Sequence, residues 1–429
     1  MRAAFWLLAL FAVAVATALV AGNNQAVVTV FWPPHRVDLS FNLVMLLLTG
    51  IFLLLYLAMR AVSAALSLPL EARRWRAQQK ERAMYGALMD ALAHQLAGRY
   101  IRATKSAQNA LAQEKSLAAI AVQAGPSASH PVNRASQLQS LAHLLVAESA
   151  QSLQNKALRD RHLVLALESS APRHAMEVRE GVQFRAARWA LDDRDASACL
   201  ESLAQLPQGA ARRTLALRMK LRATRQLQQT AQAIETARLL AKHRAFSPAA
   251  AQSIVRGLAL ELLNEAHDPA QLQQAWLSLD DNERAMPELV VHAATRLMAL
   301  HGDAALARSW LLQVWNAVLL PAADISDSLR IKLVMALEVG FDSLDAPWLA
   351  RIEAAQRARP QDTDLQYLAG MAFMSRQLWG KARQLLSQAA TGLQDARLHR
   401  NAWRALAVLA EQRGDEPAAI HAYKQAAQR

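Results

Sequence analysis

Two long runs without a charged residue stand near the start of the chain and constrain its fold more than any other feature. Residues 3–21 and residues 39–59 contain no Asp, Glu, Lys or Arg and are dominated by apolar side chains. At 1.5 Å per residue, helices of these lengths span about 28 Å and 31 Å, close to the ~30 Å hydrocarbon core of a bilayer. The sequence therefore predicts two membrane-spanning helices, which form a membrane anchor over residues 1–60.

The first run has an alternative interpretation as a cleaved signal peptide. Arg2 would be the basic residue that precedes its apolar stretch, and Ala14, Ala16 and Ala18 would supply small residues near a cleavage site. The second run predicts a membrane anchor under either interpretation.

The distribution of Lys and Arg predicts the orientation of the anchor. The loop over residues 22–38 contains only Arg36, whereas residues 60–82 contain six Lys and Arg. By the positive-inside rule the loop crosses the membrane and the C-terminal part stays in the cytoplasm. In a bacterium this predicts a multi-pass inner-membrane protein with a short periplasmic loop. Alternating apolar and polar residues predict a β-hairpin in that loop, or an interfacial use of Phe31 and Trp32.

Residues 61–82 form a basic juxtamembrane segment. Its densest part is Arg73, Arg74, Trp75 and Arg76, which we place at the headgroup boundary with Trp75 as the interfacial ring. Anionic lipid attracts such a segment, so membrane lipid is a predicted partner. Residues 83–429 hold 40 Lys and Arg against 32 Asp and Glu, an excess that we interpret as spread along the chain. For that reason we predict no nucleic-acid partner, although the formal net charge of the whole chain is +13.

Residues 83–429 predict a cytoplasmic domain of repeated helical hairpins. Only 14 Gly and 14 Pro occur in 429 residues, which argues against an all-β fold with many tight turns. An order of large, small, turn, small and large residues recurs over 291–314, 366–389 and 403–426, with weaker copies over 98–110 and 187–199. This order is typical of the tetratricopeptide repeat. The predicted fold class is all-α, with two transmembrane helices followed by a tetratricopeptide-like α-solenoid.

Local signals place the helix boundaries within this domain. Ser247-Pro248 and Asp268-Pro269 each put a capping side chain before a proline at the first helical position. The spacing of such breaks predicts helices of about 12–16 residues joined by short turns. Residues 124–136 contain several Gly, Pro and Ser residues and are predicted to be a loop.

No pattern for catalysis, a metal or a cofactor stands out. The sequence has no glycine-rich dinucleotide fingerprint and no phosphate-binding loop. Cys199, the single cysteine, falls at a small buried repeat position and is interpreted as a core thiol, whereas Glu265-x-His267 is interpreted as a solvated turn. A single axial histidine has no spacing signature, so haem or porphyrin binding has no sequence marker here, and we predict no cofactor. The twelve histidines, among them His94, His143, His162, His292 and His421, are interpreted as ordinary helix residues.

Two motifs stand out beside the anchor, the basic segment and the repeats. The first is the loop sequence with Trp32, Pro33, Arg36 and Asp38, and the second is Trp379-Gly380-Lys381-Ala382. Together, and in this order along the chain, these parts resemble the HemY family of proteobacterial inner-membrane proteins. We expect these positions to be structural or to face a partner, and Trp379 and Trp403 to pack in the core between repeats.

The resemblance implies a role in a late step of protohaem synthesis, without an assigned catalytic residue. The leading hypothesis is a scaffold that is not itself an enzyme and that binds or regulates late haem-pathway enzymes such as ferrochelatase. One alternative is an adaptor for envelope assembly that binds other inner-membrane proteins. A second alternative is an enzyme that modifies porphyrin or haem.

Overall fold

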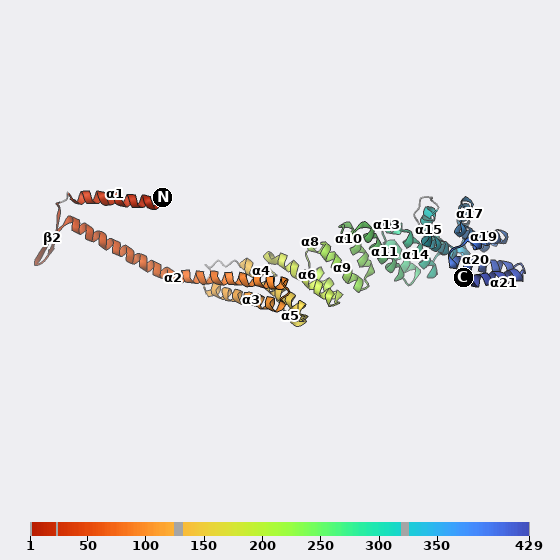
Figure 1. The fold of residues 1–429 in the computed structure, drawn as a ribbon, viewed down its shortest axis with the longest axis horizontal. Coiled ribbons are helices and arrows are strands. Elements are labelled where there is room, and N and C mark those ends of the chain that lie inside the picture. The colour runs from red at the N-terminus through yellow and green to blue at the C-terminus, as the bar shows by residue number, and fades with distance from the viewer. Residues whose placement is uncertain (1, 23–24, 124–131, 319–325, 429) are drawn as a thin grey trace. The chain divides into compact units, whose positions relative to one another are not determined.

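A computed structural model describes residues 2–22, 25–123, 132–318 and 326–428, and these are helical apart from one small β-hairpin. The chain divides into two compact units, Met1–Arg179 and Glu180–Arg429. Figure 1 follows the elements in chain order from red to blue. The all-helical character predicted for the chain is confirmed for the described residues.

Unit 1 contains the hairpin and the longest helices. Its elements are α1 (Arg2–Gly22), β1 (Val27–Trp32), β2 (His35–Ser40), α2 (Phe41–Leu96), α3 (Tyr100–Gln123), α4 (Val132–Ser152), α5 (Lys156–Ser169) and the 3₁₀ turn η1 (Arg173–Ala175). Strands β1 and β2 pair antiparallel, with Val30 opposite Val37 and Trp32 opposite His35. The predicted β-hairpin is confirmed.

Helix α2 is a single unbroken helix of 56 residues (Figure 1). The Oγ of Ser40 caps its start by accepting a hydrogen bond from the backbone N–H of Leu43 at 3.3 Å. Its first 25 residues, Phe41–Ala65, have a mean hydropathy of 2.4 and are exposed, so this stretch is long and apolar enough to cross a membrane. The last part buries Met84, Ala87 and Ala91 as α2 packs against α3. The predicted domain boundaries after residues 60 and 82 both lie inside this helix.

Helix α1 has 21 residues, in agreement with the helix predicted from the first apolar run. Its apolar stretch in the described residues is limited to Leu8–Leu19, which is shorter than a membrane span. A second membrane-spanning helix is therefore not confirmed and stays a prediction.

Helix α6 (Met176–Asp192) begins in unit 1 and continues into unit 2, which consists of shorter helices. These are α7 (Ala196–Ala204), α8 (Gln208–Ala211), α9 (Thr214–Gln226), α10 (Thr230–Lys242), α11 (Pro248–Asn264), α12 (Pro269–Ser278), α13 (Asp281–Arg284), α14 (Pro287–Ala299), α15 (Ala304–Val318), α16 (Asp327–Glu338), η2 (Phe341–Ser343), α17 (Ala346–Ala358), α18 (Thr363–Ser375), α19 (Trp379–Gly392), α20 (Ala396–Glu411) and α21 (Glu416–Ala427). Ser247 and Asp268 cap α11 and α12 as predicted.

Eight of the described turns between consecutive helices share one geometry. A residue shortly after the first helix has a positive φ, and the next backbone N–H donates to the carbonyl five residues earlier, which is the Schellman pattern. In the last hairpin, for example, Gly414 has φ 74° and the N–H of Asp415 bonds to the carbonyl of Ala410 at 3.0 Å. The same pattern occurs at Gly98, Gln154, Arg194, Gln228, Arg244, His301 and Gln377.

These turns join the helices that the repeat pattern predicted. Copies 291–314, 366–389 and 403–426 correspond to the pairs α14/α15, α18/α19 and α20/α21, and the weaker copy 187–199 corresponds to α6/α7. Small buried residues such as Ala402, Ala405 and Ala422 let the last two helices approach closely. The main apolar core of unit 2 is one continuous cluster that extends from Leu217 to Leu409.

Two local predictions need correction. Of the predicted loop 124–136, residues 124–131 lie outside the described part of the chain, and residues 132–136 belong to α4. Helices α3 and α4 have 24 and 21 residues, which exceeds the predicted 12–16. Neither helix contains a proline or glycine, so nothing in its sequence ends it earlier.

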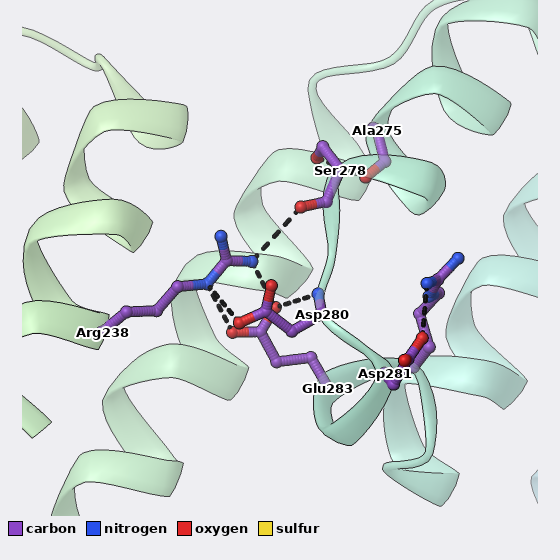
Figure 2. Close-up of polar contacts among 7 residues, drawn as sticks. Arg238, Ala275, Ser278, Asp280, Asp281 and Glu283 are labelled. Atoms are coloured by element: carbon purple, nitrogen blue, oxygen red, sulfur yellow. Dashed lines mark hydrogen bonds and ion pairs between the residues drawn. The ribbon is translucent and has the colours of Figure 1, made fainter. Parts of the chain in front are cut away.

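An ion pair between the half-buried Arg238 and the buried Glu283 links neighbouring hairpins in unit 2 (Figure 2). Arg238 of α10 donates from Nε to Glu283 Oε1 at 2.9 Å, and its guanidinium also contacts Asp280 and the carbonyl of Ser278. Glu283 is only 4% exposed and accepts a further hydrogen bond from the backbone N–H of Asp280, at the start of α13. One arginine thereby joins α10 to the α12–α13 turn.

We expect Gly370→Leu to destabilise the protein and Gly380→Leu to leave it nearly unchanged. A Cβ at Gly370 would lie 2.7 Å from Cγ and 3.3 Å from the backbone N of Leu386, whereas a Cβ at Gly380 would meet nothing within 4 Å. Overpacking at Gly370 should cost about 1–3 kcal/mol of unfolding free energy. The check is denaturant unfolding of the full-length protein in detergent. Equal midpoints for the two variants would show that α18 and α19 do not cross at Gly370.

Arg238→Met should lower the unfolding free energy by about 3 kcal/mol, because it leaves the carboxylate of Glu283 buried without its partner. Arg284→Met is the matched control, since Arg284 pairs with Asp281, whose side chain is 96% exposed, and such a pair contributes about 0–1 kcal/mol. Adding Glu283→Leu to Arg238→Met should restore part of the stability. The measurement is denaturant unfolding. If Arg238→Met and Arg284→Met lowered the unfolding free energy by similar amounts, burial of Glu283 would not explain the contribution of the Arg238 ion pair.

Candidate functional site

The first predicted motif lies on the β-hairpin between α1 and α2. Trp32 is 75% exposed at the end of β1, and Phe31 beside it is 73% exposed. Arg36 places its Nε 3.3 Å from Asp38 Oδ1 and its guanidinium carbon 5.5 Å from the centroid of the Phe31 ring. With Pro33 in the turn, these residues form an exposed aromatic tip that is stiffened by one ion pair, and such a tip suits contact with an interface or a partner.

The juxtamembrane motif lies within α2, after its apolar part. The side chains of Arg73 and Arg74 are outside the part of the chain that the structure describes. Trp75 is 62% exposed, and Arg76 is also exposed. Their predicted placement at the lipid headgroups stays a prediction.

The third motif forms the start of α19, and its four residues differ in environment. Ala382 is fully buried, and Gly380 is exposed. Lys381 lies 3.4 Å from Glu353 of α17 and 5.2 Å from the centroid of the Phe373 ring, so it links three helices. Trp379 is 39% exposed, and the prediction that it packs in the core is wrong, because it stands at the first position of α19, outside the crossing. Trp403 is partly buried against the main core.

Two of the histidines lie together, which sequence spacing did not reveal. His143 of α4 and His162 of α5 place their Nδ1 atoms 2.9 Å apart. Burial, then the neighbouring His162 and Lys115, lowers the pKa of His143 to about 4. The pair is thus neutral near pH 7, with one ring donating to the other.

The remaining candidate groups are structural. Cys199 is fully buried, as predicted, and burial raises the pKa of its thiol to about 11, which makes it a poor nucleophile. Glu265 follows the end of α11 and accepts a hydrogen bond from the Thr230 hydroxyl, while His267 is exposed in the turn. Among the described residues, no group of three or more His, Cys, Asp or Glu side chains is arranged to hold a metal ion.

The positive charge of the repeat domain is clustered, contrary to the interpretation that it is spread. Residues 202–260 contain ten Lys and Arg and a single acid, Glu235. The excess of Lys and Arg over Asp and Glu is larger in this segment than in residues 83–429 as a whole. The reason is that most acids of unit 2 lie after residue 260. A running charge count along the sequence would have found this block, whereas the total for the domain hides it.

Helix α9 presents part of this block at an open hollow. The hollow has a volume of about 450 Å³ and is lined by Arg218, Leu221, Arg222, Arg225, Gln226 and Phe246. We call it the arginine hollow. Its three arginines stand at positions i, i+4 and i+7 of α9, so they project from one side of the helix.

The three arginines differ in the hydrogen bonds and ion pairs that they already make. Arg218 donates to the carbonyl of Ala245 at 2.9 Å and lies 5.7 Å from the centroid of the Phe246 ring. Arg225 is 3.8 Å from Glu261, a long ion pair between exposed groups. Arg222 is exposed and makes neither an ion pair nor a hydrogen bond with any described residue. Arg222 therefore has its full set of donors available.

Acidic residues border the arginine hollow on two sides. An adjoining hollow of about 570 Å³ shares Arg222 and Gln226 and includes Asp192 and Asp195. Hydrogen bonds from Ala198 and Ser197 hold the pKa of Asp195 below its usual value, so it is negatively charged. A second adjoining hollow, of about 550 Å³, shares Arg225 and includes Glu261 and Glu265.

Comparison with solved structures finds other helical proteins. One is the structure of Naa15/Naa10 bound to HypK-THB, with 12% identity and a TM-score of 0.25 over 79% of this chain and 57% of that chain. The TPR domain of P58(IPK) has 12% identity and a TM-score of 0.22 over 81% and 99%, and the Cut9–Hcn1 hetero-tetramer has 16% and 0.27 over 80% and 66%. All three TM-scores are low, so the helical-repeat assignment rests on the hairpins of this chain itself.

No curated protein matches the chain. A family model described as the HemY protein N-terminus matches residues 27–131, which begin in the β-hairpin, include all of α2 and α3, and extend to the start of α4. The match includes the loop motif and the juxtamembrane motif, whereas the motif Trp379-Gly380-Lys381-Ala382, on which the predicted resemblance was also based, lies outside it. Residues 27–131 are thus similar to the N-terminus of HemY proteins, and this similarity supports membership of the HemY family.

Proposed function

We propose that the chain is a membrane-anchored helical-repeat scaffold that acts in a late step of protohaem synthesis by binding or regulating pathway enzymes, with ferrochelatase among them. The activity proposed is binding, not catalysis. The HemY match supports the pathway, and the exposed surface of the repeats supports the mode of action.

The observation that carries the proposal is the continuity of α2. Its exposed apolar part, Phe41–Ala65, passes without a break into a part that packs against α3. As one helix of 56 residues it extends about 84 Å. A scaffold attached in this way holds its first hairpins close to the membrane, where tethering raises the effective concentration of membrane-associated partners.

We further propose that α1 is a second span, with the β-hairpin in the periplasm and the repeats in the cytoplasm of a bacterium. The six Lys and Arg within residues 60–82 support this orientation.

Deleting the gene should raise cellular porphyrin, because the late enzymes lose the surface that gathers them. The full-length chain should restore normal porphyrin, and a chain that lacks residues 1–65 should not, although its repeats are intact. The matched control replaces Phe41–Ala65 with an unrelated apolar helix of equal length, which should restore function if the span only tethers. Unchanged porphyrin and haem in the deletion strain would contradict the proposed pathway. Crosslinking that recovers only envelope-assembly proteins would favour an envelope adaptor instead.

A fluorescent reporter fused after Arg429 should be active and an alkaline phosphatase reporter at the same place inactive, because the first matures in the cytoplasm and the second in the periplasm. Replacing Arg73 and Arg74 with Ala should weaken this preference without changing the fold. Phosphatase activity in the unmodified chain would reverse the proposed orientation.

A further inference from the structure

The arginines of the arginine hollow are spread along α9 and do not converge on one point. Arg218 and Arg225 are seven residues apart, which is about 10 Å along the helix axis. A single small anion could contact only part of this row. Two carboxylates on one short peptide segment can each contact a different arginine of the row, so they match it better.

The lining also offers apolar surface. Leu221 and Phe246 belong to the same hollow as the arginines. The Phe246 ring is partly buried and lies beneath the guanidinium of Arg218. An apolar side chain between or beside two carboxylates would contact this apolar surface.

The acids that border the hollow limit what can bind. Asp192 and Asp195 lie on the α7 side, and Glu261 and Glu265 lie on the α11 side. A ligand that continued beyond the arginines with more negative charge would meet these carboxylates and be repelled. A ligand with basic residues next to a short acidic core would be attracted at both borders.

We propose that the arginine hollow binds a short segment of a partner protein in which two carboxylates flank an apolar residue and basic residues stand on either side. This rests on the proposed scaffold function and names the chemistry of the partner. Arg222 and Arg225 receive the carboxylates, and Phe246 contacts the apolar side chain. The acids that border the hollow repel further carboxylates, and so they limit the length of the acidic part of the bound segment.

The same borders disfavour two other polyanions. Nucleic acid carries a phosphate at every step, and an anionic membrane presents a continuous negative surface, so either would place negative charge against Asp195 and Glu261. A short segment of mixed charge avoids this repulsion and is therefore the occupant that the geometry favours.

The test uses the full-length protein in detergent and two fluorescein-labelled peptides with inverted charges. The first is Lys-Lys-Glu-Leu-Glu-Lys-Lys, and the second is Glu-Glu-Lys-Leu-Lys-Glu-Glu. Fluorescence anisotropy should show tighter binding of the first peptide, even though it has a net positive charge and the protein is basic. Preference for the second peptide, or for a single-stranded oligonucleotide, would show that net charge alone governs binding and would overturn the proposal.

Variants locate the contact. Arg222→Glu should weaken binding of the first peptide about tenfold and reduce its salt dependence, because it reverses a charge that has no partner in the free protein. Lys242→Glu is the matched control: it makes the same charge change at an exposed residue of the same basic block, outside the hollow, and should alter binding less than about twofold. Equal losses for both variants, at equal thermal stability, would contradict a local site.

The two proposals fail in different ways. A chain that restores normal porphyrin in the deletion strain but binds neither peptide contradicts only the peptide site. If the protein binds the first peptide through Arg222 but deletion of its gene leaves cellular porphyrin unchanged, only the haem-pathway function is contradicted.

Discussion

Close packing between paired helices is the constraint on which the rest of this structure depends. A hairpin of two amphipathic helices cannot bury its apolar face alone, so each pair must also pack against the next. Alanines such as Ala402 and Ala422, and Gly370 opposite Leu386, bring the axes close enough for Leu and Trp side chains to fill the space on either side. The continuous core from Leu217 to Leu409 is the result.

Polar contacts between hairpins then add specificity to this apolar packing. Arg238 holds Glu283 across two hairpins, and Arg308, which is 4% exposed, donates to the carbonyls of Gly340 and Ser343. Each arginine satisfies groups at the end of a neighbouring helix or turn that packing alone would leave unpaired. In the same basic block, Arg222 has no such partner in the described residues, and for that reason it is the residue that a ligand can use.

Helix α2 contains both the apolar stretch of the proposed anchor and the surface that packs against α3. This one helix would therefore hold the proposed scaffold at the membrane. A backbone inside a bilayer must satisfy its own hydrogen bonds, and a helix does so. Helix α2 keeps this geometry beyond its apolar part until Leu96, where Gly98 allows the first Schellman turn. The HemY match covers this connection, so the segment that the family model describes includes the one that joins the apolar stretch Phe41–Ala65 to the first helical hairpin.

The sequence by itself predicted the apolar run over residues 39–59, which the structure extends to Ala65, together with the β-hairpin and the helical class. It also predicted the helix pairs α14/α15, α18/α19 and α20/α21. Hydrophobic runs, alternation and the spacing of small residues are local patterns, so they can be read without the tertiary structure. The sequence did not reveal the positive φ of Gln154, Arg194 and Gln377, since this conformation is imposed by the packing of two helices and not by a glycine. Only the tertiary structure decided that Trp379 is exposed, that His143 meets His162, and that Arg218, Arg222 and Arg225 share a hollow with Phe246. Each of these outcomes depends on which helices are neighbours, and residues far apart in the chain carry no local signal of that.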